Sequence, residues 1–445
     1  MKKLHSSAPG FQAAEEIALT LAGKGFRCAL VGGSVRDLLL GRTPSDFDLV
    51  TTARPEEMAR VFPEFKLVGA SFGVGLIRRS GIDIEIASAR SERSYLDGRH
   101  PDKVVYTTDL SLDARRRDFT VNALMYDFAG DEILDYTGGV SDLQQGILRA
   151  VGVPDERFEE DYLRMLRAIR FAAKLNFQLE PELFAALKRN ARKVTALSGE
   201  RVFSELDSML TGRFPERAFR LLESSGVLAH LLPEVAVLRN IEQPPQFHPE
   251  GDVLEHTLLM LRRMALPSRK LAWSVLLHDV GKAVTFSRDP DGRIRFFGHE
   301  DAGVELVENI CRRLHFSNAD AESIIHAVRF HMRFASVQNM KLAKLRRLIG
   351  EKDFNMELEL HRLDCLCSNG LMDGFNFLLD KLQEFSVGDS VALPEPLVRG
   401  RDLTANGIKG QAKFKLVLDA VYERQLAGEF PDAGTALAAA LEYFK

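Results

Sequence analysis

The sequence predicts an α/β domain followed by several helical domains. Between about residues 25 and 137, short apolar runs of strand length alternate with turns and short helical segments. From about residue 155 onward, apolar residues recur at three-and-four spacing, which is typical of packed helices. Because a chain of 445 residues exceeds what one hydrophobic core supports, we expect four parts, at residues 1–145, 146–242, 248–385 and 390–445.

The expected elements of the α/β part are separated by turn residues. We expect strands at residues 26–31, 65–68, 74–78, 82–87 and 133–136, and helices at residues 34–40, 55–62 and 117–124. In the helical part, prolines within residues 243–249 and 393–396 stop helices on both sides. These two segments are therefore expected to be linkers.

The composition is that of a soluble globular protein, with 45% hydrophobic and 27% charged residues. The formal net charge of −4 excludes a global basic field, so any nucleic-acid binding must use a local basic stripe. The four cysteines have the spacing of neither a zinc ribbon nor a disulfide framework, and no apolar run approaches membrane-spanning length. We expect a cytoplasmic protein without a membrane partner, and the sequence carries no indication of its oligomeric state.

A glycine pair and an acidic pair lie close together near the N-terminus. Gly32 and Gly33 separate an expected buried strand from a helix, and backbone amides at such a turn form an anion site suited to a triphosphate. Asp46 and Asp48 are two residues apart, so on a strand both carboxylates project from one face. Carboxylates beside a phosphate site are the ligands that Mg²⁺ needs for phosphoryl chemistry. Each motif alone is compatible with an ordinary turn, whereas the two in this order predict nucleotidyl transfer with Mg²⁺.

A third carboxylate is expected on the strand at residues 82–86. Asp83 and Glu85 share one face of that strand. We select Glu85 as a catalytic carboxylate because the surrounding isoleucines indicate a buried strand, where an acid without a partner is costly. The alternative is a carboxylate on an exposed face.

Two further polar segments are candidate nucleotide contacts. Three adjacent arginines, ending at Arg117, precede Asp118 and Asn122 at an expected helix start. A solvated basic face is the alternative, but the following Asp and Asn favour contacts with a triphosphate and a sugar. Further along, Asp161, Arg164 and Arg167 recur every three residues on an expected helix, next to an apolar face.

The helical spacing of Asp161 and Arg164 permits a base to be recognised without a template. Cytosine and adenine each present an amino donor next to a ring-nitrogen acceptor, so an Asp can accept while an Arg donates. Guanine and uracil present the opposite pattern and would leave both side chains unpaired. The alternative is an amphipathic helix with ordinary salt bridges.

The second half of the chain carries an ordered set of histidines and aspartates. His256 comes first, the adjacent His278 and Asp279 end an apolar helix, and Asp364 follows much later. This set is expected to bind a divalent metal on a helical bundle, and His299 and His331 are expected to add a second metal.

The first-half motifs resemble the class II tRNA nucleotidyltransferase (CCA-adding enzyme) and bacterial poly(A) polymerase family, within the DNA polymerase β superfamily. The resemblance rests on LVGGSVRDLLLGRTPSDFDLV, RRDFTVNALMYD, EDYLRMLRAIRFAAKLNF and SGERVFSELDSML, which occur in the family's order. It implies a DNA polymerase β-like α/β nucleotidyltransferase head followed by all-α neck, body and HD domains and a small helical tail. It also implies roles for the selected residues: metal ligation by Asp46 and Asp48, with Glu85 as third carboxylate; triphosphate contacts by Gly32, Gly33, Arg36 and Arg117; and base recognition by Asp161 and Arg164.

The order of histidines and aspartates in the second half of the chain resembles that of HD-domain metal-dependent phosphohydrolases, which hydrolyse phosphomonoesters or cyclic phosphodiesters. Its fusion to the first half, including the junction QPPQFHPEGDVLEHT, resembles one branch of the tRNA enzymes. The expected function is addition of CCA, or part of it, to tRNA 3′ ends from CTP and ATP, with the basic residues 188–193 holding the RNA backbone. A-only addition, CC-only addition and poly(A) synthesis remain open, as does a phosphohydrolase with a nucleotide-binding head.

Overall fold

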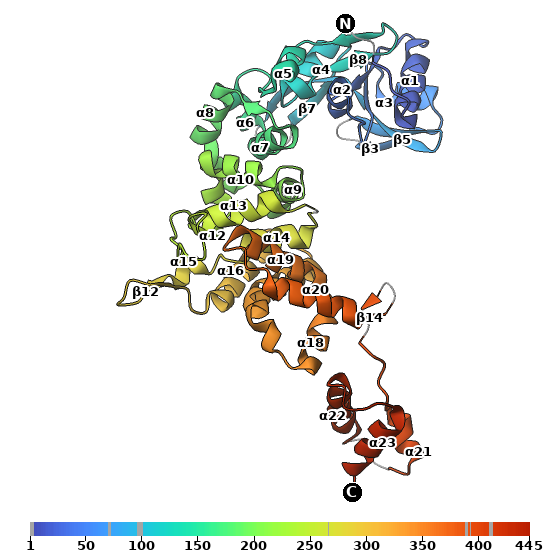
Figure 1. Ribbon diagram of the computed structural model, residues 1–445. Helices are drawn as coiled ribbons and strands as arrows, with labels where there is room; N and C mark the ends of the chain where they lie inside the picture. Colours follow the sequence, from blue (N-terminus) through green and yellow to red (C-terminus); the bar gives the residue numbers. More distant parts are fainter. Residues whose placement is uncertain are drawn as a thin grey trace. The chain divides into compact units, whose positions relative to one another are not determined.

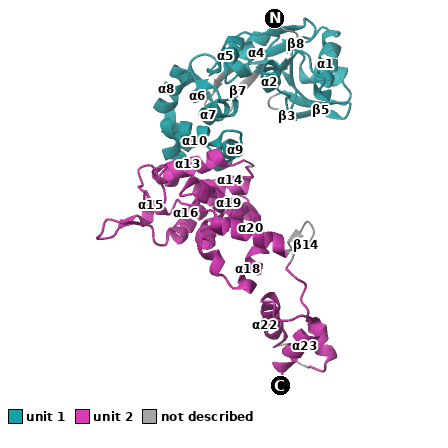
Figure 2. Ribbon diagram, in the orientation of Figure 1, with its two compact units in different colours: residues 1–233 teal, residues 234–445 magenta. Residues whose placement is uncertain are grey.

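The computed structural model describes residues 4–69, 73–95, 101–265, 267–387, 390–391, 393–408 and 413–445 (Figure 1). The chain divides into two compact units, Met1–Pro233 and Glu234–Lys445 (Figure 2). Within the described stretches, every helix is too short or too polar to cross a bilayer.

The first unit begins with a mixed sheet of seven strands in the order β3-β4-β5-β2-β1-β8-β9. The strands are β1 Cys28–Val31, β2 Asp48–Thr51, β3 Lys66–Gly69, β4 Val74–Arg79, β5 Ile82–Ser88, β8 Met125–Asp127 and β9 Glu132–Leu134. Neighbouring strands are antiparallel except β2 and β5, where Leu49 lies opposite Ile86 in parallel register. The five expected strands are confirmed within three residues at each end. A separate hairpin of β6 Arg90–Tyr95 and β7 Pro101–Tyr106 was not expected.

Helices surround this sheet and continue beyond it. They are α1 Pro9–Ala22, α2 Gly33–Leu39, α3 Pro55–Val61, α4 Leu110–Arg115, α5 Gly139–Gln145, α6 Pro154–Glu160, α7 Leu163–Leu175, α8 Pro181–Asn190, α9 Gly199–Leu210, α10 Pro215–Ser224 and α11 Val227–Leu231. The three-and-four spacing of α7 is confirmed, because Leu166 and Ile169 are fully buried on the face that packs against α9 and α10. The expected run of helices is interrupted by a two-residue parallel pair, β10 Ile147–Leu148 and β11 Gln178–Leu179.

The helix expected at residues 117–124 is wrong. Helix α4 ends at Arg115, and only a 3₁₀ turn, Thr120–Asn122, forms further on. Phe119 between them is extended, pairs with Ala150 in an isolated bridge and has a ring that is 1% exposed. Burial of that ring and the long-range bridge therefore override the local helical pattern.

The second unit is mostly helical, with a fully buried Trp273 against Phe316 in its core. Its helices are α12 Pro233–Ala236 at the unit boundary, α13 Val253–Arg263, α14 Arg269–Leu277, α15 Lys282–Thr285, α16 His299–Arg313, α17 Asn318–Phe330, α18 Leu342–Ile349, α19 Phe354–Cys367, α20 Asp373–Phe385, α21 Gly400–Ala405, α22 Phe414–Leu426 and α23 Ala433–Glu442. Two small hairpins are added by β12 Ser287–Arg288 with β13 Ile294–Arg295, and by β14 Ser386–Val387 with β15 Ser390–Val391.

Candidate active sites

Three carboxylates of the first unit gather where β2 and β5 lie side by side. Asp48 begins β2 opposite Val31, and the parallel register of β2 and β5 places Glu85 beside it. Burial and, after it, the negative charges of Asp46 and Glu85 together raise the pKa of Asp48 to about 6, with the charge of Arg117 opposing them. Asp46 and Glu85 therefore lie near enough to Asp48 for their charges to act on it. This acidic cluster of Asp46, Asp48 and Glu85 is not offset by Arg117, which is an environment that favours a divalent cation.

Two details of the acidic cluster differ from the sequence expectation. Asp46 precedes β2 instead of lying in it, although buried Phe47 still points to the opposite side, against Phe11. Glu85 lies on the exposed face of β5, because the buried side chains there are Ile84 and Ile86. The burial argument for Glu85 was thus wrong, and what marks this residue is its charge acting on Asp48.

The glycine turn lies directly under two arginines. Gly32 has φ +73°, a conformation that favours glycine. A Cβ atom added at Gly32 would lie 3.4 Å from a guanidinium nitrogen of Arg117, and one added at Gly33 would lie 3.4 Å from a guanidinium nitrogen of Arg36. Glycine at both positions therefore keeps open the space between the backbone and these cations.

A chain of hydrogen bonds joins the predicted nucleotide contacts behind this turn. Arg36, which is 3% exposed, pairs with Asp37 at 2.9 Å and donates to the Oδ1 atom of Asn122 at 2.5 Å. Asn122 donates to Asp118 at 3.2 Å, and Asp118 accepts from Arg167 at 2.6 Å. Burial alone would raise the pKa of Asp118, but the Arg167 charge and hydrogen bond hold it below its usual range. These four residues, although far apart in sequence, form one rigid polar layer.

Asp113 is a residue that the sequence reasoning missed. Its fully buried carboxylate pairs with Arg116 at 2.6 Å and with Arg117 at 3.2 Å. Burial raises its pKa, but the two arginines outweigh burial and lower it overall. Asp113 thereby holds two of the three adjacent arginines in place. The sequence does contain a sign of this pairing, because Asp113 precedes Arg116 by three residues and Arg117 by four, the spacing of side-chain pairs on a helix.

The predicted base-reading residues do not lie on one helix, which corrects the sequence expectation. Helix α6 ends at Glu160 and α7 begins at Leu163, so Asp161 lies at the junction. Its carboxylate accepts a hydrogen bond from the Leu163 amide at 3.0 Å, a local bond that Asp forms readily outside helices. Arg164 lies in the first turn of α7 and contacts Glu160.

Both side chains predicted to read the base are held in place by neighbouring groups. Arg201, on α9, donates to both carboxylate oxygens of Asp161 at 2.9 Å. Arg164 donates to the carbonyl oxygens of Arg157 at 3.1 Å and of Arg116 at 3.2 Å. The role of Arg201 was missed because it lies forty residues from Asp161.

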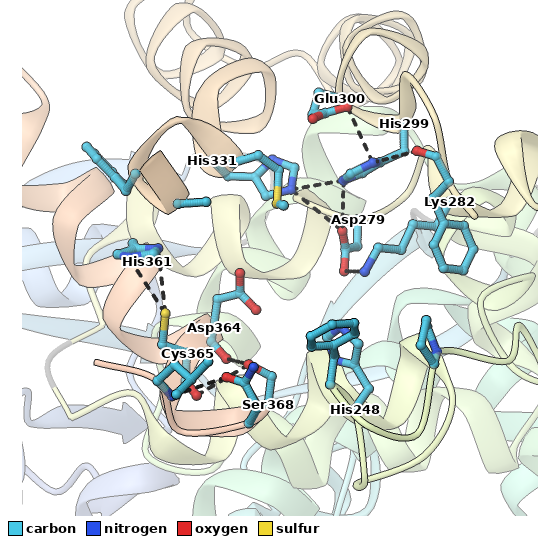
Figure 3. Close-up of a pocket in the computed structure, with 18 of the residues that line it drawn as sticks. His248, Asp279, Lys282, His299, Glu300, His331, His361, Asp364, Cys365 and Ser368 are labelled. Atoms are coloured by element: carbon cyan, nitrogen blue, oxygen red, sulfur yellow. Dashed lines mark hydrogen bonds and ion pairs between the residues drawn. The ribbon is translucent and has the colours of Figure 1, made fainter. Parts of the chain in front are cut away.

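The second unit brings all six predicted metal-binding side chains into one buried site. His256 Nε2 lies 3.2 Å from Asp364 Oδ1, and His278 Nε2 lies 3.1 Å from Asp279 Oδ2. His299 Nε2 lies 3.1 Å from His331 Nε2. Figure 3 shows Asp279 facing His299 and His331 on one side and Lys282 on the other. Asp279 belongs to two groups of three residues, and within each group the ligand atoms lie within 4.8 Å of one another. The first group is His256, His278 and Asp279, and the second is Asp279, His299 and His331.

The imidazole rings at this site are oriented through their Nδ1 atoms. Those of His278, His299 and His331 donate to backbone carbonyl oxygens at 2.7–2.9 Å. His256 Nδ1 donates to Glu250 at 2.6 Å, and Glu250 also contacts His248 at 2.9 Å. This pattern leaves every Nε2 facing the cluster, as in histidines that bind metals. Glu250 was missed by the sequence reasoning, although it lies in the quoted junction.

The chemistry of this donor set fits a divalent cation. The Nε2 atoms of His256 and His278 are buried. Carboxylate oxygens of Asp364 and Asp279 lie 3.2 Å and 3.1 Å from them, but in the described parts of the chain neither atom makes a hydrogen bond of good geometry. Burial lowers the pKa of His331 to about 4, so its ring is neutral at pH 7. Burial would raise the pKa of Asp279 and Asp364, but the neighbouring histidines, joined at Asp279 by Lys282, hold both below their usual range. Burial would lower the pKa of His256, but the carboxylates of Asp364 and Glu250 raise it to about 9, so a bound cation would have to displace its proton. A neutral imidazole beside charged carboxylates, as at His331, is a typical metal-ligand set.

A cavity of about 760 Å³ opens onto this site. Besides the metal-binding side chains, its lining includes cationic or aromatic groups: His248, Lys282, Arg295, Phe247 and Phe297. Such a cavity accommodates a phosphate ester with an organic group attached.

Three family descriptions match the chain. "Poly A polymerase head domain" matches residues 28–149, "Probable RNA and SrmB- binding site of polymerase A" matches residues 176–238, and "HD domain" matches residues 252–363.

Named relatives and solved structures agree with these matches. The multifunctional CCA protein of Nitrosomonas eutropha is 38% identical over 308 residues, which cover 68% of this chain and 72% of that protein. The CCA-adding enzyme of Geobacillus kaustophilus is 39% identical over 223 residues, covering 50% of this chain and 55% of that protein. The crystal structure of the Bacillus stearothermophilus CCA-adding enzyme in complex with CTP has a TM-score of 0.73 at 25% identity and covers 98% of both chains. The chain thus belongs to the family of CCA-adding enzymes and multifunctional CCA proteins.

Proposed function

We propose that this protein adds C, C and A to the 3′ ends of tRNA, using CTP and ATP as substrates. The observation that carries the proposal is the cluster of Asp46, Asp48 and Glu85 beside the open glycine turn. The names of the relatives, CCA-adding enzyme and multifunctional CCA protein, support CCA addition over poly(A) synthesis. Because tRNA is the proposed substrate, we place the protein in the cytoplasm.

We propose that the four parts expected from the sequence divide this work. Residues 1–145 would form the nucleotidyltransferase head, residues 146–242 a neck and body for base and RNA contacts, residues 248–385 the HD domain and residues 390–445 a helical tail. The matched segments 28–149, 176–238 and 252–363 support the first three.

The head residues divide into groups that bind metal, triphosphate and base. Two Mg²⁺ ions bound by Asp46 and Asp48 would activate the RNA 3′-hydroxyl and offset charge on the departing pyrophosphate. Arg36, Arg117 and the amides of the glycine turn would hold the triphosphate in line with that hydroxyl. Glu85 would supply a further carboxylate.

The base would be recognised by the edge formed by Asp161 and Arg164. The Asp161 carboxylate would accept from the amino group of cytosine or adenine, and Arg164 would donate to the adjacent ring nitrogen. Arg201 orients the Asp161 carboxylate by donating to both of its oxygens. Asp118, Asn122 and Arg167 support the layer behind the triphosphate.

The proposal is tested by pyrophosphate release. The purified full-length protein with Mg²⁺ and CTP is expected to release pyrophosphate only when a tRNA lacking its CCA end is present. Release that does not depend on tRNA, or no release with any nucleotide, would contradict the proposal.

The raised pKa of Asp48 predicts how Mg²⁺ use depends on pH. A proton on this carboxyl competes with the cation, and below its pKa of about 6 the protonated form dominates. The Mg²⁺ concentration that gives half-maximal CMP incorporation is therefore expected to be nearly constant at pH 7–8 and to rise about tenfold per pH unit below pH 6. Titrations with Mg²⁺ at pH 5, 6, 7 and 8 measure this, and a value unchanged between pH 7 and pH 5 would contradict it.

The histidine and aspartate cluster supports a second activity, hydrolysis of phosphomonoesters or cyclic phosphodiesters. A divalent cation held there would act as a Lewis acid on a phosphoryl oxygen. Lys282 and His248 line the same cavity and would neutralise the phosphate charge. The observation that favours this function is the orientation of the histidine rings. Their Nδ1 atoms are held by hydrogen bonds, and their Nε2 atoms face the cluster.

Glu250 provides a sharp test of the cluster. Glu250→Ala removes the acceptor of His256 Nδ1 and is expected to raise the Mn²⁺ concentration needed for hydrolysis of bis-p-nitrophenyl phosphate about 10- to 100-fold. Glu305→Ala, on an exposed face of α16, is the matched control and should change nothing. CMP incorporation by the head should be unaffected by both variants. An unchanged Mn²⁺ requirement in Glu250→Ala would show that this carboxylate does not orient a ligand.

A further inference from the structure

The first unit contains a second, strongly basic pocket away from the acidic cluster. It has a volume of about 460 Å³ and lies where the C-terminal end of α9 meets α7. Four cationic side chains line it: Arg42, Arg170, Lys174 and Arg213. Among the described residues, its other lining groups are apolar, glycine or hydroxyl groups, and none is acidic.

Three of these cations have no acidic partner among the described residues. Arg170 pairs with Glu205 at 2.6 Å. Arg42 and Lys174 are exposed and lack ion pairs in the described stretches, and Arg213 contacts the ring of Phe214 at 5.2 Å. The pocket therefore keeps uncompensated positive charge in a chain with a net charge of −4.

The basic segment that the sequence singled out for RNA binding is different. Arg189 pairs with Asp155 and with Glu182, each at 2.6 Å, and Lys193 pairs with Glu159. Two of the four cations at residues 188–193 are thus already partly neutralised, and the cations that line the pocket lie elsewhere.

The pocket adjoins the predicted nucleotide contacts through one aromatic ring. The Arg170 guanidinium lies 4.3 Å from the centre of the Phe171 ring. The guanidinium groups of Arg36 and Arg167 lie 5.5 Å and 5.3 Å from the same ring centre. Arg42, on the pocket's other side, follows α2, the helix that begins at the glycine turn. An RNA whose 3′-hydroxyl reaches the triphosphate would therefore have backbone phosphates close to this pocket.

We propose that the pocket formed by Arg42, Arg170, Lys174 and Arg213 binds backbone phosphates next to the 3′ end of the RNA substrate. This inference rests on the proposed function. Exposed cations and hydroxyl groups in an open pocket are suited to binding phosphodiester groups. Such phosphate contacts do not depend on which base the nucleotide carries. The nucleotide triphosphate has its own cations at Arg36 and Arg117 and does not require these.

Two of these cations also lie at the C-terminal ends of helices. Lys174 is in the last turn of α7, and Arg213 follows the end of α9. A cation near a helix C-terminus stabilises that helix. A purely structural role would change thermal stability but leave RNA affinity and its salt dependence unaltered, so the two roles give different results.

The test measures binding of a fluorescently labelled tRNA that lacks its CCA end to the full-length protein, without nucleotide. Lys174→Ala/Arg213→Ala is expected to weaken binding about tenfold near 0.1 M salt and to make the slope of log K against log salt shallower by about 1.5. The matched control is Arg189→Ala/Lys193→Ala, which removes the same charge from paired positions and should have a much smaller effect. Arg42→Ala, outside the helices, should weaken binding severalfold without lowering Tm, and Lys174→Arg/Arg213→Lys should restore wild-type affinity.

Each other outcome would overturn either this inference or the function on which it rests. Equal weakening by both double variants would show a general charge effect. Unchanged tRNA affinity, with weaker binding of CTP or inorganic phosphate, would show a subsite for small anions, and weaker binding of a phosphopeptide alone would show a protein partner. If the wild type incorporates CMP into tRNA while Lys174→Ala/Arg213→Ala binds tRNA normally, only this inference fails. If the wild type binds tRNA but incorporates nothing, the proposed function fails instead.

Discussion

Asp48→Asn is expected to reduce CMP incorporation into tRNA by about 10³-fold or more, because a catalytic metal site supplies several kcal/mol of transition-state stabilisation and each 1.4 kcal/mol is worth about tenfold. Asp48 lies between the charges of Asp46 and Glu85, which raise its pKa, so the cluster loses its central carboxylate in this variant. Single-turnover incorporation at saturating tRNA measures the loss. Binding of tRNA should remain within about twofold of wild type, since phosphate contacts dominate that affinity.

Asp83→Asn is the matched control for Asp48→Asn. Asp83 lies on the same strand as Glu85, two residues away, and its carboxylate faces Arg78 at 3.7 Å. This variant removes one negative charge from the same sheet and should retain wild-type incorporation. Comparable losses in the two variants would mean that net charge, and not a metal site at Asp48, controls the rate.

Removal of the base-reading edge is expected to abolish most of the selectivity for nucleotides. A site built to hydrogen-bond one pattern rejects a base lacking it by on the order of 10⁴-fold. Asp161→Ala should therefore reduce the ratio of kcat/KM for CTP to that for UTP by about 10²-fold or more, and Arg164→Ala should do the same. Competition between labelled CTP and UTP on one tRNA measures the ratio.

Two companion variants separate base recognition from general disruption. Arg201→Ala frees the carboxylate of Asp161 and should raise the KM for CTP more than it lowers kcat, with partial rescue by Arg201→Lys. Asp155→Asn, at a nearby carboxylate that pairs with Arg189, should leave the ratio unchanged. A normal CTP-to-UTP ratio in both Asp161→Ala and Arg164→Ala would place base recognition elsewhere in the chain.

The parts of the fold that the sequence predicted correctly are those with strong local patterns. Apolar strand runs gave β1, β4 and β5, and three-and-four spacing gave α7. The hairpin of β6 and β7 was missed because its strands, RSERSY and PDKVVY, contain too few apolar residues to form a recognisable strand pattern. The helix expected at residues 117–124 failed because Phe119 pairs with a strand residue distant in the sequence.

The candidate sites divide in the same way. Asp46 and Asp48 were selected from their spacing, and their role as metal ligands stays a prediction. His256, His278 and Asp279 were selected from their residue types and order as a set, and the structure brings them together. The residues that hold them were not, because Asp113, Arg201 and Glu250 have meaning only through three-dimensional contacts. Asp161 was predicted to lie on a helix because spacing alone does not reveal that its carboxylate accepts a hydrogen bond from the Leu163 amide, at the start of the next helix.

We propose that this one chain selects its nucleotides through protein side chains and completes the tRNA end. The decisive experiment supplies the protein with Mg²⁺, CTP and ATP, separately and together, on tRNAs ending at the discriminator base, at C and at CC, and sequences the products. All three ends are expected to become CCA when both nucleotides are present, and addition with CTP alone is expected to stop after the second C. Long A tracts on unrelated RNA, addition that stops at CC with both nucleotides present, or no incorporation on any end would contradict it.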